Sequence, residues 1–223
     1  METREFNDRI FGQFARIGSA LGHAKRVEIA NVLMQGERTV EAIAQQISAS
    51  VANTSRHLQI LAAAGLVTRR AEGTSRVYSL ADESVEAAYL TLVDAAETRL
   101  AEIAALAEGF FADIDDATPV SFEELDRLSR AGEAVIVDVR PSPEFAAGHV
   151  EGAINIPLAE LDARMAELPV DLDVVAYCRG TYCVMAAHAV ARLRAQGRNA
   201  RRLDGGLPEW RNAGRPVDVA AGA

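Results

Sequence analysis

Residues 51–80, VANTSRHLQILAAAGLVTRRAEGTSRVYSL, decide the fold of the first half of the chain, because a helical pattern passes directly into a hairpin pattern. Ser50 is an N-cap candidate for a helix that runs from 51 to 63 and ends at Gly65. The stretch after Gly65 has alternating character around the turn Glu72-Gly73-Thr74, which predicts two antiparallel strands. The region is therefore predicted to fold as a helix followed by a β-hairpin.

Helical patterns also precede this region. Apolar residues at steps of three and four predict an amphipathic helix over about the first twenty residues, and shorter helices follow over 26–34 and 40–47. A turn at 48–50 joins the last of these to the helix over 51–63. The sequence thus predicts a domain rich in helices, a helix-turn-helix with a hairpin wing behind it, which is a known geometry for docking on DNA.

The helix over 51–63 begins with side chains of the kind that read base edges in the major groove. A recognition helix presents short polar and basic groups from its first turns. The residues predicted to face DNA are Asn53, Thr54, Ser55, Arg56 and His57. Arginines in the hairpin suit phosphate or minor-groove contacts, and these are Arg69, Arg70 and Arg76. A basic hairpin directly after a polar helix favours DNA contact over a merely solvated charged face.

The net charge of -9 does not exclude nucleic acid, because the acidic residues are unevenly distributed. Residues 1–82 hold 10 Lys and Arg against 8 Asp and Glu, whereas residues 83–223 hold 13 against 24. The first part is therefore weakly basic, and double-stranded operator DNA is its predicted partner.

The bulk properties are those of a soluble protein with two domains. A chain of 223 residues exceeds the usual size of one domain, and no apolar run approaches the roughly 20 residues of a membrane span. The N-terminus is amphipathic and carries acids, unlike a signal peptide. We therefore expect a cytoplasmic protein without a membrane partner or a cofactor, whose two cysteines are reactive rather than structural.

The longest helical pattern covers 83–112 and carries a heptad-like apolar stripe. Residues of this stripe include Tyr89, Val93, Ala96, Leu100 and Ile103. A stripe on a helix that follows a small domain needs a partner, and pairing with the same helix of a second chain predicts a homodimer. The alternative is that the stripe packs within its own domain. An acidic run with Pro119 near its end predicts a linker at 114–120, between domains at 1–113 and 121–219.

From Ser121 the pattern changes to apolar strands that alternate with helices. Helices are predicted over 121–132, 159–168 and 184–196, and buried strands over 134–139 and 173–177. This alternation predicts an α/β domain with a parallel central sheet that is covered on both faces.

A candidate reactive site follows the second of these strands. The sequence Cys178-Arg179-Gly180-Thr181-Tyr182-Cys183 forms a loop between the strand and a helix. A thiolate at Cys178 would face a helix N-terminus, which lowers its pKa, and Arg179 adds a nearby positive charge. Gly180 lets the loop curl so that its N–H groups form an anion-binding nest. An arched loop is also expected to hold the two sulfurs on different sides of its mouth. A buried, inert thiol is the alternative.

The first half resembles the ArsR family of winged-helix repressors over about residues 10–112. The similarity is carried by SRHLQILAAAGLV, by the wing that contains Glu72-Gly73, and by VYSL. The resemblance implies a homodimer on an operator palindrome, which represses transcription until an inducer binds. Members that sense metals carry Cys ligands on the helix before the recognition helix, or Asp and His ligands on the dimer helix. Here TVEAIAQQIS has neither Cys nor His and 83–112 has no His, so no metal site is expected in this half.

The second half resembles a rhodanese domain over residues 120–219, in VIVDVRPSPEFAAGHVEGAINIPLAEL, YCRGTYC and LDGGLPEWRNAGRPV. The resemblance implies that Cys178 accepts sulfur as a persulfide, and that the residues from Arg179 to Cys183 line its cradle as a catalytic loop. Asp138 and Arg140 follow the first buried strand, where they either contact the substrate or support the cradle. Cys183 is unusual for the family and is a candidate resolving thiol.

Three hypotheses for the function remain open. The first is a transcription repressor that senses reactive sulfur species, persulfide or polysulfide, through Cys178 with Cys183. We favour it because a turnover enzyme has no need of a recognition helix. The second is a thiosulfate or persulfide sulfurtransferase that also binds DNA. The third is a sensor of arsenite or another soft metal, with His188 as a third ligand beside the two cysteines.

Overall fold

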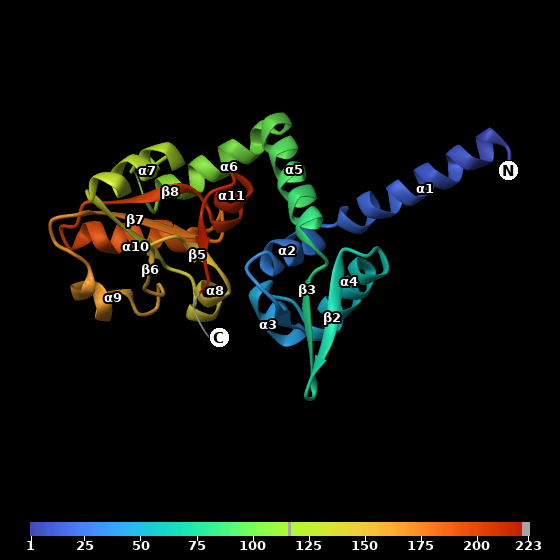
Figure 1. The fold of residues 1–223 in the computed structure, drawn as a ribbon, viewed down its shortest axis with the longest axis horizontal. Helices are drawn as coiled ribbons and strands as arrows, with labels where there is room; N and C mark the ends of the chain where they lie inside the picture. Colours follow the sequence, from blue (N-terminus) through green and yellow to red (C-terminus); the bar gives the residue numbers. More distant parts are fainter. Residues whose placement is uncertain (116, 220–223) are drawn as a thin grey trace. The chain divides into compact units, whose positions relative to one another are not determined.

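The structure, a computed structural model, describes residues 1–115 and 117–219 and consists of two compact units (Figure 1). The first unit covers Met1–Val93 and the second begins at Asp94. Residue 116, within the predicted linker, lies outside the described residues. In the described part of the chain, no helix combines the length and the apolar character that crossing a membrane requires.

The first unit is mainly helical and contains one small antiparallel sheet with the order β1-β3-β2. Its helices are α1 (Thr3–Leu21), α2 (Ala24–Leu33), α3 (Val40–Gln46) and α4 (Val51–Ala63). Its strands are β1 (Arg38–Thr39), β2 (Val67–Glu72) and β3 (Ser75–Leu80). Figure 1 shows β2 and β3 as a hairpin that extends away from the helices of this unit. The predicted winged helix-turn-helix fold is confirmed.

Local signals at the helix ends fix the position of α4. The Ser50 hydroxyl accepts a hydrogen bond from the Asn53 N–H at 3.3 Å and so begins the helix. Gly65 follows the helix with a positive φ of 78°, a conformation that glycine adopts without steric cost, and turns the chain into β2. Beneath α4, buried apolar side chains of three helices form the core, among them Ile29, Leu33, Ile43, Leu58 and Leu61.

The helical pattern over 83–112 forms two helices rather than one. Helix α5 (Glu83–Arg99) begins in the first unit and ends in the second. Leu100 then takes an extended conformation with φ -114° and ψ 91°, and α6 (Ala101–Ala112) begins after it. The interpretation as one continuous helix is wrong here, because the apolar periodicity continues through Leu100 although the backbone does not.

The second unit is built on a parallel sheet with the strand order β6-β4-β7-β8. The strands are β4 (Ala134–Asp138), β6 (Ile154–Asn155), β7 (Asp173–Cys178) and β8 (Ala200–Gly206). A separate antiparallel pair joins β5 (His149–Val150) and β9 (Val217–Asp218). The helices are α7 (Phe122–Ala131), α8 (Ser142–Ala147), α9 (Leu161–Arg164), α10 (Val184–Ala195) and α11 (Leu207–Asn212). The predicted α/β domain with a parallel central sheet is confirmed.

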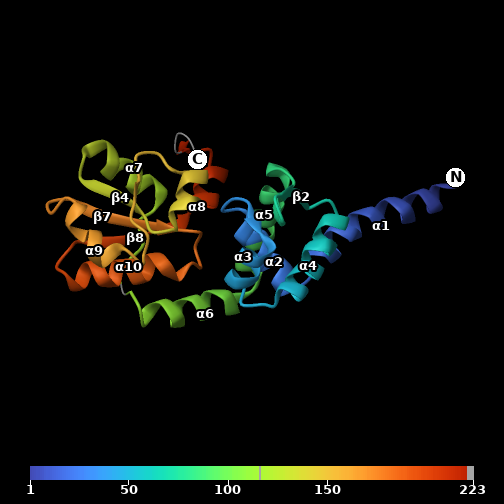
Figure 2. The ribbon, with the colours of Figure 1, turned by 90° about the horizontal axis from the view of Figure 1, so that it is seen from below.

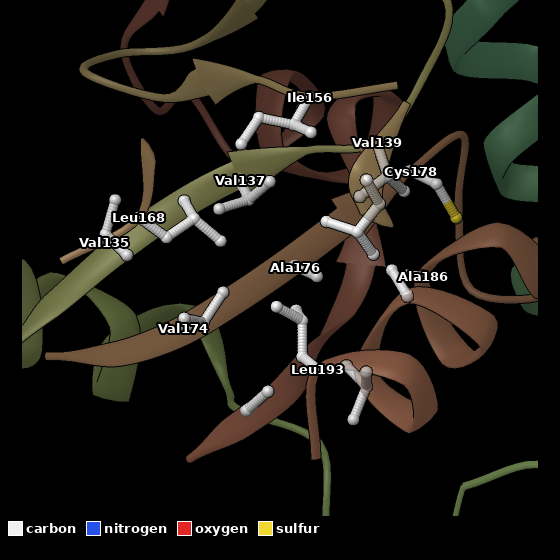
Figure 3. Close-up of a cluster of buried hydrophobic side chains, with 14 residues drawn as sticks. Val135, Val137, Val139, Ile156, Leu168, Val174, Ala176, Cys178, Ala186 and Leu193 are labelled. Carbon is white, nitrogen blue, oxygen red and sulfur yellow. The ribbon is translucent and has the colours of Figure 1, made fainter. Parts of the chain in front are cut away.

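Helices cover both faces of this sheet, as Figure 2 shows for α7 on one side and α9 and α10 on the other. Successive side chains of a strand point to opposite faces. Val137 and Val174 therefore belong to the cluster that packs against α10, which Figure 3 shows. Ile136 and Val175, their sequence neighbours, pack on the opposite face with side chains of α7 and α11. Burial on both faces explains why these strands are apolar at every position.

Candidate functional site

The two cysteines lie at the carboxyl end of β7, where the chain passes into α10. Cys178 is the last residue of β7 and Cys183 is the N-cap of α10, so the four residues between them form a loop at the helix N-terminus. Figure 3 shows Cys178 at this end of the strand, beside Val139 and Ala186. Neither thiol is in a disulfide bond. Strand, loop and helix follow one another as the sequence predicts.

Backbone N–H groups around this loop point at both sulfurs. Arg179 and Ala186 donate to the Cys178 sulfur, and Arg179 and Met185 donate to the Cys183 sulfur. The Cys178 thiol itself donates to the carbonyl oxygen of Cys183 at 3.2 Å. The first N–H groups of a helix have no partner within it, so they stabilise a negative charge on sulfur.

The two sulfurs are therefore on the same side of the loop. Both accept from the N–H group of Arg179, and the single Cys178 S–H, which donates to the carbonyl oxygen of Cys183, is shared with the Cys183 sulfur. The expectation that an arched loop would hold them on different sides of its mouth is wrong. The physical reason is that the loop closes as a tight turn, in which the N–H group of Cys183 donates to the carbonyl oxygen of Gly180 at 3.0 Å.

The pKa values of the two cysteines shift in opposite directions. Burial raises the pKa of Cys178, which is 1% exposed. The hydrogen bond from Cys178 lowers the pKa of Cys183 to about 6, and the N–H groups of Arg179 and Met185 assist it. The prediction of a lowered pKa at Cys178 itself is wrong, because that sulfur has no access to water. The pair instead holds its negative charge on the half-buried Cys183, with Cys178 as the hydrogen-bond donor.

Arg179 forms an ion pair with Glu144 instead of pointing into the loop. Its Nε lies 2.9 Å from Oε2 and its Nη2 lies 2.6 Å from Oε1 of Glu144, which is 3% exposed on α8. The guanidinium therefore holds the first residue of the loop against α8. The positive charge of Arg179 also helps to lower the pKa of Cys183, as the sequence predicts. The sequence did not reveal the Glu144 partner, since a Glu in a short helix 35 residues earlier carries no local signal.

Glu209 supports the loop from the other side and was also missed. Its carboxylate accepts hydrogen bonds from the N–H groups of Gly206, at 2.9 Å, and Thr181, and burial raises its pKa. A Cβ added to Gly180 would lie 3.0 Å from Oε1 of Glu209, and one added to Gly206 would lie 2.3 Å from the nitrogen of Gly180. Both glycines are therefore needed for the close approach of the loop to β8 and α11. The Leu-Pro-Glu start of α11 was the available signal, because a Glu at the N3 position reaches back to the N–H group of the N-cap residue, here Gly206.

Asp138 and Arg140 support the sheet rather than contact a ligand. Both are fully buried, and the Arg140 Nε lies 3.0 Å from each carboxylate oxygen of Asp138. Arg140 also donates to the carbonyl oxygen of Gly148 at 2.7 Å. Of the two interpretations open at the sequence level, substrate contact is contradicted by this burial, and support of the surrounding backbone fits it.

Tyr182 is the most exposed residue of the loop, with 45% of its surface accessible. Its hydroxyl donates to Oε1 of Glu97 at 2.8 Å. Glu97 lies in α5, within the second unit. The hydroxyl therefore bonds to a residue outside the loop, a partner that the loop sequence alone did not indicate.

The predicted DNA-facing residues of α4 divide into two sets. Asn53 and Arg56 are exposed and Ser55 is half-buried, as a groove-reading face requires. Thr54 and His57 are buried, and their prediction as DNA contacts is wrong. They are three residues apart on the face that also buries Leu58, so the helix turns them into the core. The His57 ring instead packs against His23, with 4.6 Å between ring centroids, and burial lowers its pKa.

The three wing arginines also differ. Arg70 is paired in the free protein, because its Nε donates to Glu37 at 3.2 Å and its Nη1 lies 3.0 Å from Glu72. Arg69 and Arg76 are exposed and form no ion pair with any described residue. Phosphate contact by Arg70 would therefore replace an existing ion pair, whereas Arg69 and Arg76 carry no such cost.

The predicted dimer stripe is partly accessible. Leu100 is 50% exposed at the break between α5 and α6, and the other four stripe residues are half-buried. Further exposed apolar side chains lie on the same two helices, namely Leu92, Leu106 and Phe110. Helix α1 presents its own exposed apolar set, which includes Phe6, Phe11 and Phe14.

A three-ligand metal site around the cysteines is not supported. Within residues 1–115 and 117–219, no cluster of three or more His, Cys, Asp or Glu side chains is arranged to hold a metal ion. His188 is exposed on α10 and does not complete such a cluster with Cys178 and Cys183.

Comparison with known proteins agrees with the two halves of the structure. Residues 23–69 match the bacterial regulatory protein, arsR family, and residues 121–213 match the rhodanese-like domain. The chain is 47% identical to the HTH-type transcriptional regulator Rv0324 of Mycobacterium tuberculosis, over 95% of this chain and 93% of that one. The protein belongs to the ArsR family of transcriptional regulators. It is a member that also carries a rhodanese-like domain.

Each half of this ArsR-family regulator also has relatives of its own. A sulfurtransferase of Allochromatium vinosum is 33% identical over 43% of this chain and 89% of that one. The solution NMR structure of the homodimeric winged helix-turn-helix DNA-binding domain of a possible ArsR-family regulator from Mycobacterium bovis has 36% sequence identity. It covers 45% of this chain and 91% of that one, with a TM-score of 0.42.

Proposed function

We propose that this regulator senses reactive sulfur species through Cys178, with Cys183 as its partner thiol. The observation that carries the proposal is the pair itself. The two thiols share the backbone N–H group of Arg179, each accepts a second N–H group from the first turn of α10, and the pKa of Cys183 is lowered to about 6. A helix N-terminus with a low-pKa thiol is the environment of a reactive cysteine and not of a structural one.

The pair supports sulfur transfer without an outside oxidant. Cys178 attacks a sulfur of a polysulfide or persulfide and passes its own proton to the Cys183 thiolate. The S–S bond of the donor breaks, and its outer fragment leaves with the bonding electron pair. Cys178 then carries one or more added sulfur atoms.

Cys183 completes the reaction as the resolving thiol. If Cys178 carries one added sulfur, Cys183 attacks Sγ of Cys178, forms a disulfide and releases hydrosulfide, which takes the proton from Cys183. If Cys178 carries two, attack on the inner added sulfur gives a trisulfide and again releases hydrosulfide. Either bridge replaces the hydrogen bond from Cys178 to the carbonyl oxygen of Cys183, because the donor proton is gone.

The DNA side of the proposal rests on α4 and the wing. Asn53 and Arg56 are exposed where base contacts are expected, and Arg69 and Arg76 are exposed where phosphate contacts are expected. The exposed apolar residues of α5 and α6 favour a homodimer, in which two copies of α4 would meet the two halves of an operator palindrome. We further propose that the protein acts in the cytoplasm as a repressor.

Sulfurtransferase activity is the second candidate, and the similarity of residues 121–213 to rhodanese-like domains favours it. One experiment separates the candidates. Operator affinity and sulfur loading are measured by gel shift and intact mass after treatment with inorganic tetrasulfide, thiosulfate or arsenite. The proposal expects tetrasulfide to load the protein and change its operator affinity. Turnover of thiosulfate with unchanged operator affinity would favour the enzyme, and a response to arsenite alone would favour a soft-metal sensor.

A further inference from the structure

The loop between the two cysteines has three attachments to the rest of the second unit, and they differ in strength. Arg179 is held by its ion pair with the buried Glu144, and the Thr181 N–H is held by the half-buried Glu209. The third attachment is the exposed hydrogen bond from Tyr182 to Glu97, at 2.8 Å. The exposed hydrogen bond of Tyr182 is weaker than the other two attachments. A change in the conformation of the loop should therefore break the Tyr182–Glu97 bond first.

Tyr182 directly precedes Cys183, the residue that a sulfur bridge would move. In the thiol form, the Cys178 sulfur lies 3.2 Å from the carbonyl oxygen of Cys183 and donates to it. A bridge to Cys183 removes that donor, and an inserted sulfur atom increases the separation of the two residues. Arg179 and Thr181 are held, so the displacement of Cys183 is passed to the neighbouring Tyr182.

Glu97 is placed to respond to this displacement. It lies near the half-buried carboxylate of Glu209. Desolvation is the main cause of the raised pKa of Glu209, and the negative charge of Glu97 adds to it. Burial and the bond to Glu97 raise the pKa of Tyr182 to about 12, so its hydroxyl remains a donor at neutral pH. When Tyr182 moves away, the Glu97 carboxylate loses its donor and is left facing the Glu209 carboxylate, which repels it.

Glu97 belongs to the last turns of α5, two residues before the helix ends at Arg99. The same helix starts at Glu83, three residues after the wing strand β3 ends at Leu80. A continuous helix carries a displacement of one end along its length, and the break at Leu100 separates this end from α6.

We propose that the Tyr182–Glu97 hydrogen bond couples the sulfur state of the Cys178–Cys183 pair to α5, and through α5 to DNA binding. The bond is present in the thiol form and is lost in the bridged form. The inference rests on the function proposed above, because it requires that Cys178 and Cys183 are the sulfur site. Glu97 contributes to the response and not to the sulfur chemistry.

The test is a pair of measurements on Glu97→Ala, with Glu102→Ala as the matched control. Glu102 is an exposed acid in the first turn of α6, so its removal changes the charge equally without touching the loop. Loading by inorganic tetrasulfide is followed by intact mass, and affinity for the DNA upstream of the gene is measured before and after loading. Glu97→Ala should load at the parental rate, and its operator affinity should change on loading at least about five-fold less than that of the parent. Before loading, it should already bind the operator as the loaded parent does.

A double-mutant cycle tests whether Tyr182 and Glu97 act through the same hydrogen bond. Tyr182→Phe should reduce the response to the same extent as Glu97→Ala, and the double variant should show no further loss, because both remove one bond. A parental response in Glu97→Ala overturns the coupling, as does a loss of sulfur loading in that variant. Cys178→Ser distinguishes this failure from that of the proposed function. If Cys178→Ser loses the response while Glu97→Ala keeps it, only the coupling is wrong, whereas a response that persists in Cys178→Ser contradicts the sulfur site itself.

Discussion

The Cys178 thiol donates to the carbonyl oxygen of Cys183 at 3.2 Å, across a loop of four residues. This relationship makes the two cysteines a single chemical unit, in which the buried thiol is the donor and the half-buried one holds the negative charge. Modification of the Cys178 sulfur removes the donor of this bond, which closes the loop at the start of α10.

The rate of sulfur loading should increase with pH, because the reaction requires the thiolate of Cys183. The pKa of Cys183 is lowered to about 6, so the thiolate that accepts the Cys178 proton is present above this pH and lost below it. Loading by tetrasulfide, followed by intact mass, should therefore rise as pH increases through about 6. In Cys183→Ser the rise should move to higher pH, because burial raises the pKa of the remaining Cys178. An identical pH profile in the two proteins would show that Cys183 takes no part.

Glu144→Gln should destabilise the protein. The Arg179 guanidinium would lose its charged partner in a largely buried position, which should lower the free energy of unfolding by about 3 kcal/mol. The control is Glu160→Gln, which weakens an ion pair with Arg164 at the surface and should cost less than about 1 kcal/mol. Urea denaturation measures both. Equal stabilities of the two variants would mean that the Arg179–Glu144 pair does not hold the loop.

Thr54→Val should leave DNA binding intact. The Thr54 hydroxyl is buried and has no hydrogen-bond partner among the described residues, so its removal relieves an unsatisfied polar group. The free energy of unfolding should stay the same or rise by up to about 1 kcal/mol. Arg56→Ala, at an exposed position two residues later, should instead weaken operator binding by about 1–3 kcal/mol. A gel shift in which Thr54→Val weakens binding as much as Arg56→Ala would restore Thr54 as a DNA contact.

If the exposed stripe on α5 and α6 forms the interface of the proposed homodimer, charged residues placed on it should prevent dimerisation. Replacing Leu100 and Ile103 by Glu places two charges on the exposed stripe at the start of α6, so sedimentation should show monomers. Operator affinity should fall with dimerisation, because a monomer contacts one half-site only. The control is the same pair of substitutions at the exposed, non-stripe positions Ala101 and Ala104, where the dimer should persist. Unchanged sedimentation of the Leu100 and Ile103 variant would place the interface elsewhere.

The sequence predicted the elements that have local signals. Helix α4 was predicted over 51–63 and occupies those residues, because Ser50 begins it and Gly65 follows it. The parallel sheet followed from strands that are apolar at every position. By contrast, β1 and β6 are two residues long and have no period to detect. Leu100 interrupts a helix inside a continuous apolar pattern, and no glycine or proline marks the place.

The sequence predicted the part of the candidate site that is contiguous in the chain, and it did not predict the residues that contact this part from distant positions. The loop from Cys178 to Cys183 could be found as a strand-to-helix junction. The residues that support the loop could not be found in this way, because Glu144 and Glu97 lie 35 and 85 positions before their partners in the loop. The same limit explains why Thr54 and His57 were predicted to contact DNA although they are buried. Polar residues at the start of a helix suit a DNA groove or a protein core equally until their packing partners are known.

The most direct test of the central claim is the operator affinity of the parent and of Cys178→Ser, each measured before and after treatment with inorganic tetrasulfide. Cys183 remains in this variant, so a general reaction of thiols with tetrasulfide is still possible. The account predicts that the parent changes its affinity on treatment and that Cys178→Ser binds the operator equally in both states. A Cys178→Ser protein that responds to tetrasulfide as the parent does would contradict it.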